Sequence, residues 1–235
     1  MTRKKKPSDA EIVEGLLRVY DRYGDSIALF ATHIYTALAS SKSLSEQVHS
    51  LRWRVKERDR LALKLGRKIE EARRAGEPFS ISEENLLTEV TDLAGVRILH
   101  LYTRQFARIH TVVLKILEDQ QYPLVEGPFA RTWDDESREF FQTCGIETQV
   151  SPNMYTSVHY VVGSASRVPM TCEIQVRTLM EEVWGEVDHA FNYPEPAKDL
   201  VTREQLKALA KVTAGASRLV DTIYLTHGLS EGIGN

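Results

Sequence analysis

The sequence predicts an α/β protein of the α+β kind, in which a mixed β-sheet of about five strands is flanked by helices. Runs rich in β-branched residues alternate with longer runs of helical periodicity, which indicates both kinds of element. The 235 residues are 42% hydrophobic and 27% charged, enough for one sizeable core. We expect one main domain at 45–195, with helical extensions at 1–44 and 196–235.

Helical patterns fill most of the first third of the chain. Residues 8–23 and 26–39 each predict a helix, and residues 45–75 predict a long third one, with an interruption near WRVKERD. The run VTDLAGVRILHLY then predicts a strand, because it is rich in aliphatic and β-branched residues.

The second half of the chain predicts a different mixture of elements. Residues 104–120 predict a helix, and the polar stretch 122–145 predicts a loop or lid. Three further strands follow: GIETQV, SVHYVVG and MTCEIQVR. Residues 179–191 and 199–227 predict the last helices, of which the second could pack on the sheet or join copies into a homo-oligomer.

Cysteine usage and hydropathy indicate the cellular compartment of the protein. Cys144 and Cys172 lie far apart, without the spacing of a zinc site or a disulfide framework. No apolar run approaches the ~18 residues that a membrane span needs. The basic start MTRKKKPSD has no apolar stretch behind it, as a secretory signal would. We therefore expect a cytoplasmic protein that does not enter the membrane.

The net charge of −3 hides a basic segment. Residues 52–74 contain ten basic and four acidic residues, which indicates either a solvated helix face or a surface for phosphates. An apolar stripe in helical spacing runs through this segment: Leu61, Leu65 and Ile69. It places three cations on another stripe, Arg60, Lys64 and Arg67, where they would repel one another without an anion.

The stretch MTCEIQVRT alternates between apolar and polar residues. Cys172, Ile174 and Val176 would face one side of a strand, and the polar side would carry Glu173, Gln175 and Arg177. On this pattern alone, the stretch is typical of an edge strand with one wet face.

Two acids could form a metal site. Asp92 opens an apolar strand and Glu173 lies on the polar side of another, so on neighbouring strands they could share Mg²⁺ with substrate phosphates. Alternatively, Asp92 only marks the strand entry. The sequence has no Walker A loop or other glycine-rich phosphate motif, so side-chain cations would hold phosphates: Arg54, Lys56, Lys64 and Arg67. Tyr155 could stack on a base at a strand entrance, or could be an ordinary core or rim residue.

Together these segments resemble the synthetase domain of the RelA/SpoT family, which makes the alarmones ppGpp and pppGpp. The matching pieces, in order and spacing, are Arg54-Val55-Lys56, Lys64, DLAGVRI, YTSVH and EIQVRTLMEEVWGEVDHAFNY. The resemblance covers about residues 52–193, implies a nucleotidyltransferase-like synthetase fold, and makes the polar side of MTCEIQVRT a floor of the nucleotide site. The lengths on either side resemble a small stand-alone synthetase, although the chain could be a piece of a longer protein.

The resemblance also implies residue roles. Asp92 and Glu173 would hold Mg²⁺, with Glu173 drawing the proton from the acceptor hydroxyl. Arg54 and Arg97 would sandwich the adenine of ATP, while its phosphates would be held by Lys56, Lys64 and Arg67. Tyr155 would stack on the acceptor guanine, and the acceptor site would be completed by His159, Gln175 and Arg177. The implied reaction transfers the β,γ-pyrophosphoryl group of ATP to the 3′-hydroxyl of GDP or GTP and releases AMP.

The acceptor side departs from the family pattern. Where the family commonly has Gly-Tyr followed by a basic or amide residue, this chain has Met154, Tyr155 and Thr156. The acceptor could therefore be another molecule, such as an adenine nucleotide or the 3′ end of tRNA, as in toxin-type relatives. A catalytically inert nucleotide-binding module is a third alternative, against which the retained Asp92 and Glu173 argue.

Overall fold

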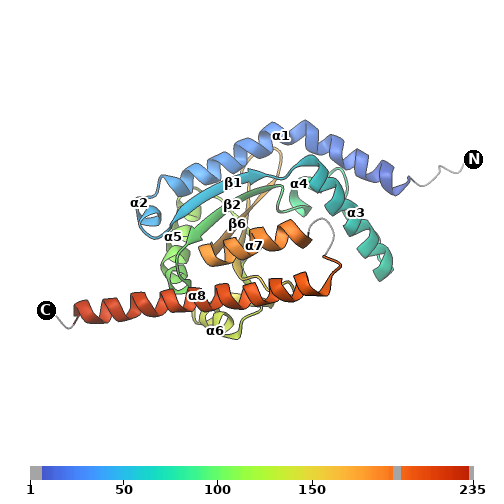
Figure 1. Cartoon of the computed structure of the whole chain (residues 1–235). Coiled ribbons are helices and arrows are strands. Elements are labelled where there is room, and N and C mark those ends of the chain that lie inside the picture. Colours follow the sequence, from blue (N-terminus) through green and yellow to red (C-terminus); the bar gives the residue numbers. More distant parts are fainter. Residues whose placement is uncertain (1–6, 193–196, 233–235) are drawn as a thin grey trace, which may run out of the picture.

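A six-stranded mixed sheet forms the centre of the structure, a computed structural model that describes residues 7–192 and 197–232 (Figure 1). The strands are β1 (Ser50–Val55), β2 (Ala94–His100), β3 (Leu124–Thr132), β4 (Glu147–Val150), β5 (Ser157–Gly163) and β6 (Thr171–Thr178). Their order is β1-β2-β6-β5-β3-β4. The pairs β2/β6 and β3/β4 are parallel and the other neighbours antiparallel, so the predicted mixed sheet is confirmed with one strand more than expected.

The expected helix over 45–75 is wrong in its first part. A short helix α2 (Lys42–Ser45) is followed by β1, and α3 (Arg58–Ala75) begins only after it. The segment WRVKERD therefore contains the end of an edge strand, which pairs with β2. Before it, the two predicted helices form one continuous helix, α1 (Asp9–Ala39).

The expected loop over 122–145 is also wrong. It contains β3 and the helix α6 (Asp135–Thr143), which Asp134 caps by accepting the backbone N–H of Ser137 at 3.0 Å. The pairing of β3 with β5 shifts register twice, between Leu124 and Phe129. Such irregularity breaks the two-residue period by which a strand is predicted.

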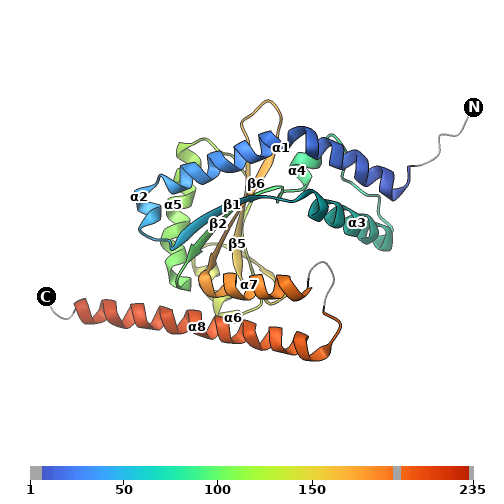
Figure 2. The ribbon, with the colours of Figure 1, turned by 45° about the horizontal axis from the view of Figure 1, so that its top comes forward.

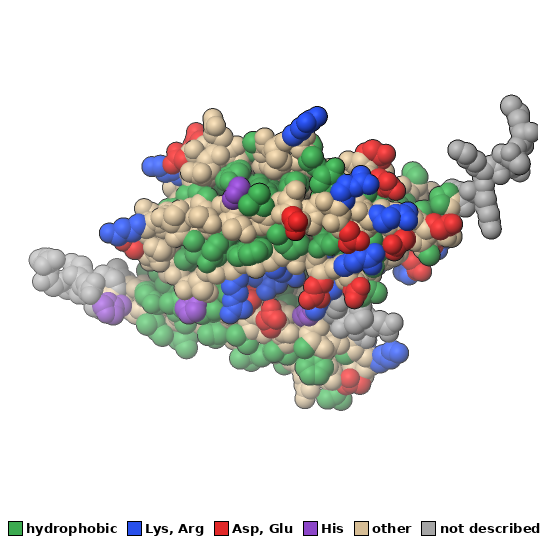
Figure 3. All heavy atoms as spheres, turned by 90° about the horizontal axis from the view of Figure 1, so that it is seen from above, with side chains coloured by type: hydrophobic (Ala, Val, Ile, Leu, Met, Phe, Trp, Pro, Cys, Tyr) green, Lys and Arg blue, Asp and Glu red, His purple; other side chains and the backbone are tan. Residues whose placement is uncertain are grey.

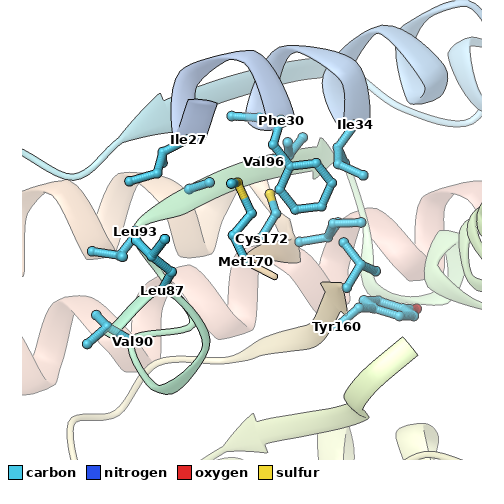
Figure 4. Close-up of a cluster of buried hydrophobic side chains, with 14 of the residues drawn as sticks. Ile27, Phe30, Ile34, Leu87, Val90, Leu93, Val96, Tyr160, Met170 and Cys172 are labelled. Atoms are coloured by element: carbon cyan, nitrogen blue, oxygen red, sulfur yellow. The ribbon is translucent and has the colours of Figure 1, made fainter. Parts of the chain in front are cut away.

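The apolar face of the sheet packs against α1. Cys172, Ile174 and Val176 of β6 are buried in the main hydrophobic cluster, together with Ile27 and Phe30 of α1 (Figure 4). The predicted alternation in MTCEIQVRT is confirmed. The prediction of an edge position is wrong, because β6 lies between β2 and β5.

The remaining helices complete two layers around the sheet. They are α4 (Leu86–Glu89), α5 (Phe106–Asp119), which follows a short 3₁₀ turn, α7 (Leu179–Asn192) and α8 (Leu200–Gly232). Helix α7 packs on β2 and β6, and α8 packs on α7, where Trp184 donates its indole N–H to the carbonyl of Leu206 at 3.0 Å. The polar side of β6 therefore faces α7. The C-terminal end of α8 extends beyond the sheet (Figure 2).

Candidate active site

Six of the predicted site residues lie on one face of the sheet: Arg54, Arg97, His159, Glu173, Gln175 and Arg177. In cross-strand register, Arg54 of β1 is opposite Gly95 of β2, which is opposite Glu173 of β6. The next row on the same face places Arg97, Gln175 and His159 side by side on β2, β6 and β5. Residues two positions apart share a face, so four strands together present these side chains towards α7.

Asp92 lies two residues before β2, at the same end of the sheet as Glu173. Its carboxylate accepts hydrogen bonds from the Nζ atoms of Lys64 at 2.7 Å and Lys56 at 2.9 Å. Burial raises the pKa of Asp92, but the two ammonium groups outweigh it and hold the pKa below its usual value. Asp92 is therefore ionised. The strand next to β2 is β6, which carries Glu173, the second acid of the predicted metal site.

Glu173 is held by two hydrogen bonds. Its Oε1 is 2.8 Å from Nδ1 of His159, and its Oε2 accepts from Nε2 of Gln175 at 2.7 Å. Burial raises the pKa of Glu173, but the bonds from His159 and Gln175 bring it below the ordinary value. His159 itself is buried, stacks on Phe129 and lies 2.6 Å from the hydroxyl of Ser157. It thus holds Glu173 from the same face of the neighbouring strand β5.

Two cavities lie beside these residues and share part of their lining. One, of about 920 Å³, lies under α7 and is lined by Arg54, Arg97, Gln175 and Tyr155. The other, of about 1050 Å³, lies between α1 and α3 and contains Lys56, Lys64 and Asp92. Arg60 and Arg67 line both cavities. In the space-filling view, basic and acidic side chains gather around a hollow near the middle of the molecule (Figure 3).

The cleft is strongly basic. Seven cationic side chains line the cavity under α7: Arg54, Arg60, Arg67, Arg97, Arg177, Arg203 and Lys207. Only three carboxylates accompany them: Glu57, Glu186 and Asp188. A concave surface with this excess of positive charge suits a polyanion such as a nucleotide phosphate chain.

Acidic residues of α7, which were not singled out in the sequence, hold the arginines. Glu182 and Glu186 both accept from Arg97, at 2.9 and 3.0 Å, and Glu182 also pairs with Arg177. Burial lowers the pKa of Arg177, as does the nearby Arg97, while Glu182 raises it. The signal was present in EEVWGE, because residues four apart share a helix face, but an acidic helix surface usually faces solvent.

The loop before β5 carries Tyr155 to the cavity. Tyr155 is half-buried, and its ring meets that of His159 edge to face. Burial raises the pKa of its hydroxyl, although the nearby Arg131 lowers it. Met154 has φ of 58°, a left-handed conformation that glycine adopts without strain. Thr156 is buried, with its hydroxyl 2.9 Å from that of Thr132, so its side chain points away from the cleft.

The oxygen ligands suit a hard divalent cation such as Mg²⁺. Asp92 and Glu173 are ionised and come from adjacent strands. Among residues 7–192 and 197–232, no three or more His, Cys, Asp or Glu side chains are grouped to hold a metal. The protein can thus offer two carboxylates, and Mg²⁺ commonly completes its octahedron with substrate phosphates and water.

Comparison with known proteins identifies the family. The family model for the region found in RelA/SpoT proteins matches residues 53–198. Small alarmone synthetase 1 from Bacillus subtilis, in a crystal structure bound to its product pppGpp, shares 20% identity with a TM-score of 0.59; the match covers 91% of this chain and 99% of that one. A GTP pyrophosphokinase family protein from Streptococcus pneumoniae shares 17% identity with a TM-score of 0.59, over 92% and 96% of the two chains. No curated protein sequence matches significantly.

The family match and the fold define the class of protein as a pyrophosphokinase. The chain belongs to the RelA/SpoT family, as its sequence motifs predicted. None of the helices in the described part of the chain has both the length and the apolar character of a membrane span.

Proposed function

We propose that this protein transfers the β,γ-pyrophosphoryl group of ATP to the ribose 3′-hydroxyl of GDP or GTP, forming (p)ppGpp and AMP. The observation that carries the proposal is the arrangement of Glu173 and Arg97 on one sheet face, beside Asp92 with its two lysines, next to a strongly basic cavity that Arg97 lines. Phosphoryl transfer requires positioning and charge stabilisation more than covalent chemistry, and this face offers both.

The donor half of the site comprises Arg54, Arg97, Lys56, Lys64 and Asp92, with Arg67 at its rim. Arg54 and Arg97 lie on adjacent antiparallel strands and line one cavity, so their planar guanidinium groups can enclose an adenine ring. Lys56 and Lys64 both pair with Asp92, and their ammonium groups would also bind the phosphates of ATP.

Divalent-metal dependence is general in this family, and Asp92 and Glu173 would hold Mg²⁺ here. The ion would neutralise charge on the phosphates during transfer. Glu173 is the base that accepts the proton of the acceptor hydroxyl. His159 and Gln175 keep its carboxylate ionised and oriented, so that the proton is taken at a fixed position.

The acceptor half comprises the loop 151–156, Gln175 and Arg177, with His159 behind them. Tyr155 offers a ring for a base to stack on, and Arg177 lies at the same cavity wall. The fold shared with a synthetase that binds pppGpp supports a guanine nucleotide as the acceptor.

A second acceptor class, an adenine nucleotide or the 3′ end of tRNA, is favoured by one observation. Thr156 occupies the position of a basic or amide residue and is buried against Thr132, so it offers no contact to acceptor phosphates. The transfer chemistry would be unchanged. We also propose a cytoplasmic location, which accords with the free thiols Cys144 and Cys172.

One assay tests the proposal and separates the acceptors. The protein is incubated with ATP and Mg²⁺ plus GDP, GTP, ADP or tRNA in parallel, and the products are identified by mass. We expect AMP and an acceptor that has gained a pyrophosphoryl group, with GDP or GTP as the best acceptor. Product only with ADP or tRNA would establish the second candidate, and no product with any acceptor would contradict the proposed reaction.

A further inference from the structure

Tyr155 is held by anchors on both of its sides. On one side, its backbone N–H reaches the hydroxyl of Ser151 at 3.4 Å. On the other, the backbone N–H of Thr156 donates to Oε2 of Glu181 at 2.9 Å. The second contact is the shorter one and involves a carboxylate, so it is the stronger restraint on the loop.

Glu181 belongs to a part of the molecule that the proposed reaction does not use. It lies in the first turn of α7, is only 6% exposed, and is absent from the lining of the basic cleft. Its own backbone N–H donates to the hydroxyl of Thr178 at 3.2 Å. A buried carboxylate requires partners, and here the partner is the backbone of the acceptor loop.

We infer that Glu181 is a positioning residue for the acceptor half: its carboxylate holds the backbone N–H of Thr156 and so fixes Tyr155 at the cleft. The inference rests on the proposed function, because it takes Tyr155 as the residue that contacts the acceptor. Glu181 itself touches no substrate. Its effect should therefore fall on acceptor binding and leave donor binding unchanged.

The surroundings of Glu181 make this anchor sensitive to pH. Burial raises the pKa of Glu181 to about 7, although the Thr156 amide and Arg177 of β6 lower it, and Asp134 at the start of α6 raises it. Two other charged or titratable groups share a small cavity with Glu181. His100 of β2 is buried and has its pKa lowered to about 4, and Arg218 of α8 pairs with Asp134 at 2.9 Å. Protonation of Glu181 removes the charge that strengthens the bond to the loop.

Two variants test the inference, with donor and acceptor KM and melting temperature measured for each. Glu181→Leu removes the acceptor of the hydrogen bond, so the KM for GDP should rise by about tenfold or more, with the KM for ATP unchanged. Glu181→Gln keeps an oxygen that can accept the bond but cannot titrate. At about pH 8 the variant should retain its affinity for the acceptor. Between about pH 6 and about pH 8, its KM for GDP should no longer show the pH dependence that Glu181 causes in the parent protein. Glu139→Gln, at an exposed carboxylate of α6, is the matched control.

The inference is overturned if Glu181→Leu leaves the KM for GDP unchanged, or raises both KM values equally. If Glu181→Leu does not fold, Glu181→Gln decides: a pH profile for GDP identical to that of the parent protein overturns the inference. Failure of the proposed function looks different, because the parent protein then forms no pyrophosphorylated product with GDP, GTP or any other acceptor.

Discussion

On the donor side of the cleft, the side chains come from strands and one helix and are held by ion pairs; on the acceptor side, a single loop carries the aromatic ring. Lys56 and Lys64 converge on Asp92 from the end of β1 and from α3. Tyr155 instead follows Met154, whose backbone is left-handed, and depends on Glu181 for its position. The donor half is therefore preorganised by regular structure, and the acceptor half by loop anchors that a single substitution can change.

This difference makes the acceptor half the part of the site that can change substrate without loss of the chemistry. Loops vary more readily than the elements that they connect. The following predictions test whether the two halves are energetically separate, and each is measurable in the purified protein.

Glu173→Gln should have the largest effect, because it removes the carboxylate that serves both halves. We expect turnover to fall by about a hundredfold to ten-thousandfold, with folding and most ATP binding retained. Steady-state rates and calorimetric titration with an ATP analogue would measure this. Full activity in the variant would exclude Glu173 as the base.

Glu181→Gln should stabilise the fold at neutral and higher pH. The pKa of Glu181 is raised from 4.5 to about 7, so the folded state binds the proton more tightly and the free energy of unfolding falls as pH rises through that interval. Above about pH 7 the free energy of unfolding is lower by on the order of 3 kcal/mol. The Glu181→Gln variant avoids this decrease, because its amide does not titrate. In urea unfolding, the difference in the free energy of unfolding between the variant and the parent protein should be small near about pH 4 and should increase with pH. A difference independent of pH would contradict the raised pKa.

Tyr155→Ala should weaken acceptor binding by about 1–3 kcal/mol, the contribution of stacking on a base, and leave ATP binding nearly unchanged. Tyr155→Phe is the matched control and should keep most of the affinity. Separate titrations with donor and acceptor, together with melting temperatures, distinguish the roles. Equal loss of both substrates with a lowered melting temperature would make Tyr155 a structural residue.

Arg97→Lys should weaken ATP binding by about 1 kcal/mol and leave acceptor binding unchanged, because an ammonium group cannot stack on adenine as a guanidinium can. Lysine can still pair with Glu182 or Glu186, so the contact to α7 is partly kept. Unchanged affinity for ATP in a calorimetric titration would exclude the predicted sandwich.

Met154→Gly should have the smallest effect, a stabilisation of up to about 1 kcal/mol, because glycine adopts positive φ without the strain that Met154 bears. Thermal unfolding would measure it. A clear destabilisation would mean that packing of the Met154 side chain stabilises the fold by more than the strain of its positive φ destabilises it.

The polar face of β6 was predicted better than the segment that contains β1, for physical reasons. The alternation of Glu173, Gln175 and Arg177 with apolar residues identified the polar face of β6, because its other face is fully buried. The segment containing β1 was predicted as part of a helix, although Leu51, Trp53 and Val55 alternate with Arg52, Arg54 and Lys56 as in a strand, because it leads directly into the helical pattern of residues 58–75.

Tertiary contacts explain what could not be predicted. β3 was missed because its register against β5 is irregular. The proposed roles of Glu181 and Glu182 depend on Thr156 in the loop before β5 and on Arg97 of β2, which are distant from them in sequence. A central place for β6 likewise follows from strand order, which residue pattern alone does not contain.

The most direct test of pyrophosphoryl transfer follows both transferred phosphorus atoms. ATP labelled with different isotopes at its β- and γ-phosphorus atoms is incubated with the protein, Mg²⁺ and the best acceptor, and the products are separated. We expect both labels in the acceptor product in equal amounts, AMP without label, and about a hundredfold to ten-thousandfold less of that product with Glu173→Gln. Transfer of the γ label alone with release of ADP, or release of both labels as free phosphate, would contradict the proposed reaction.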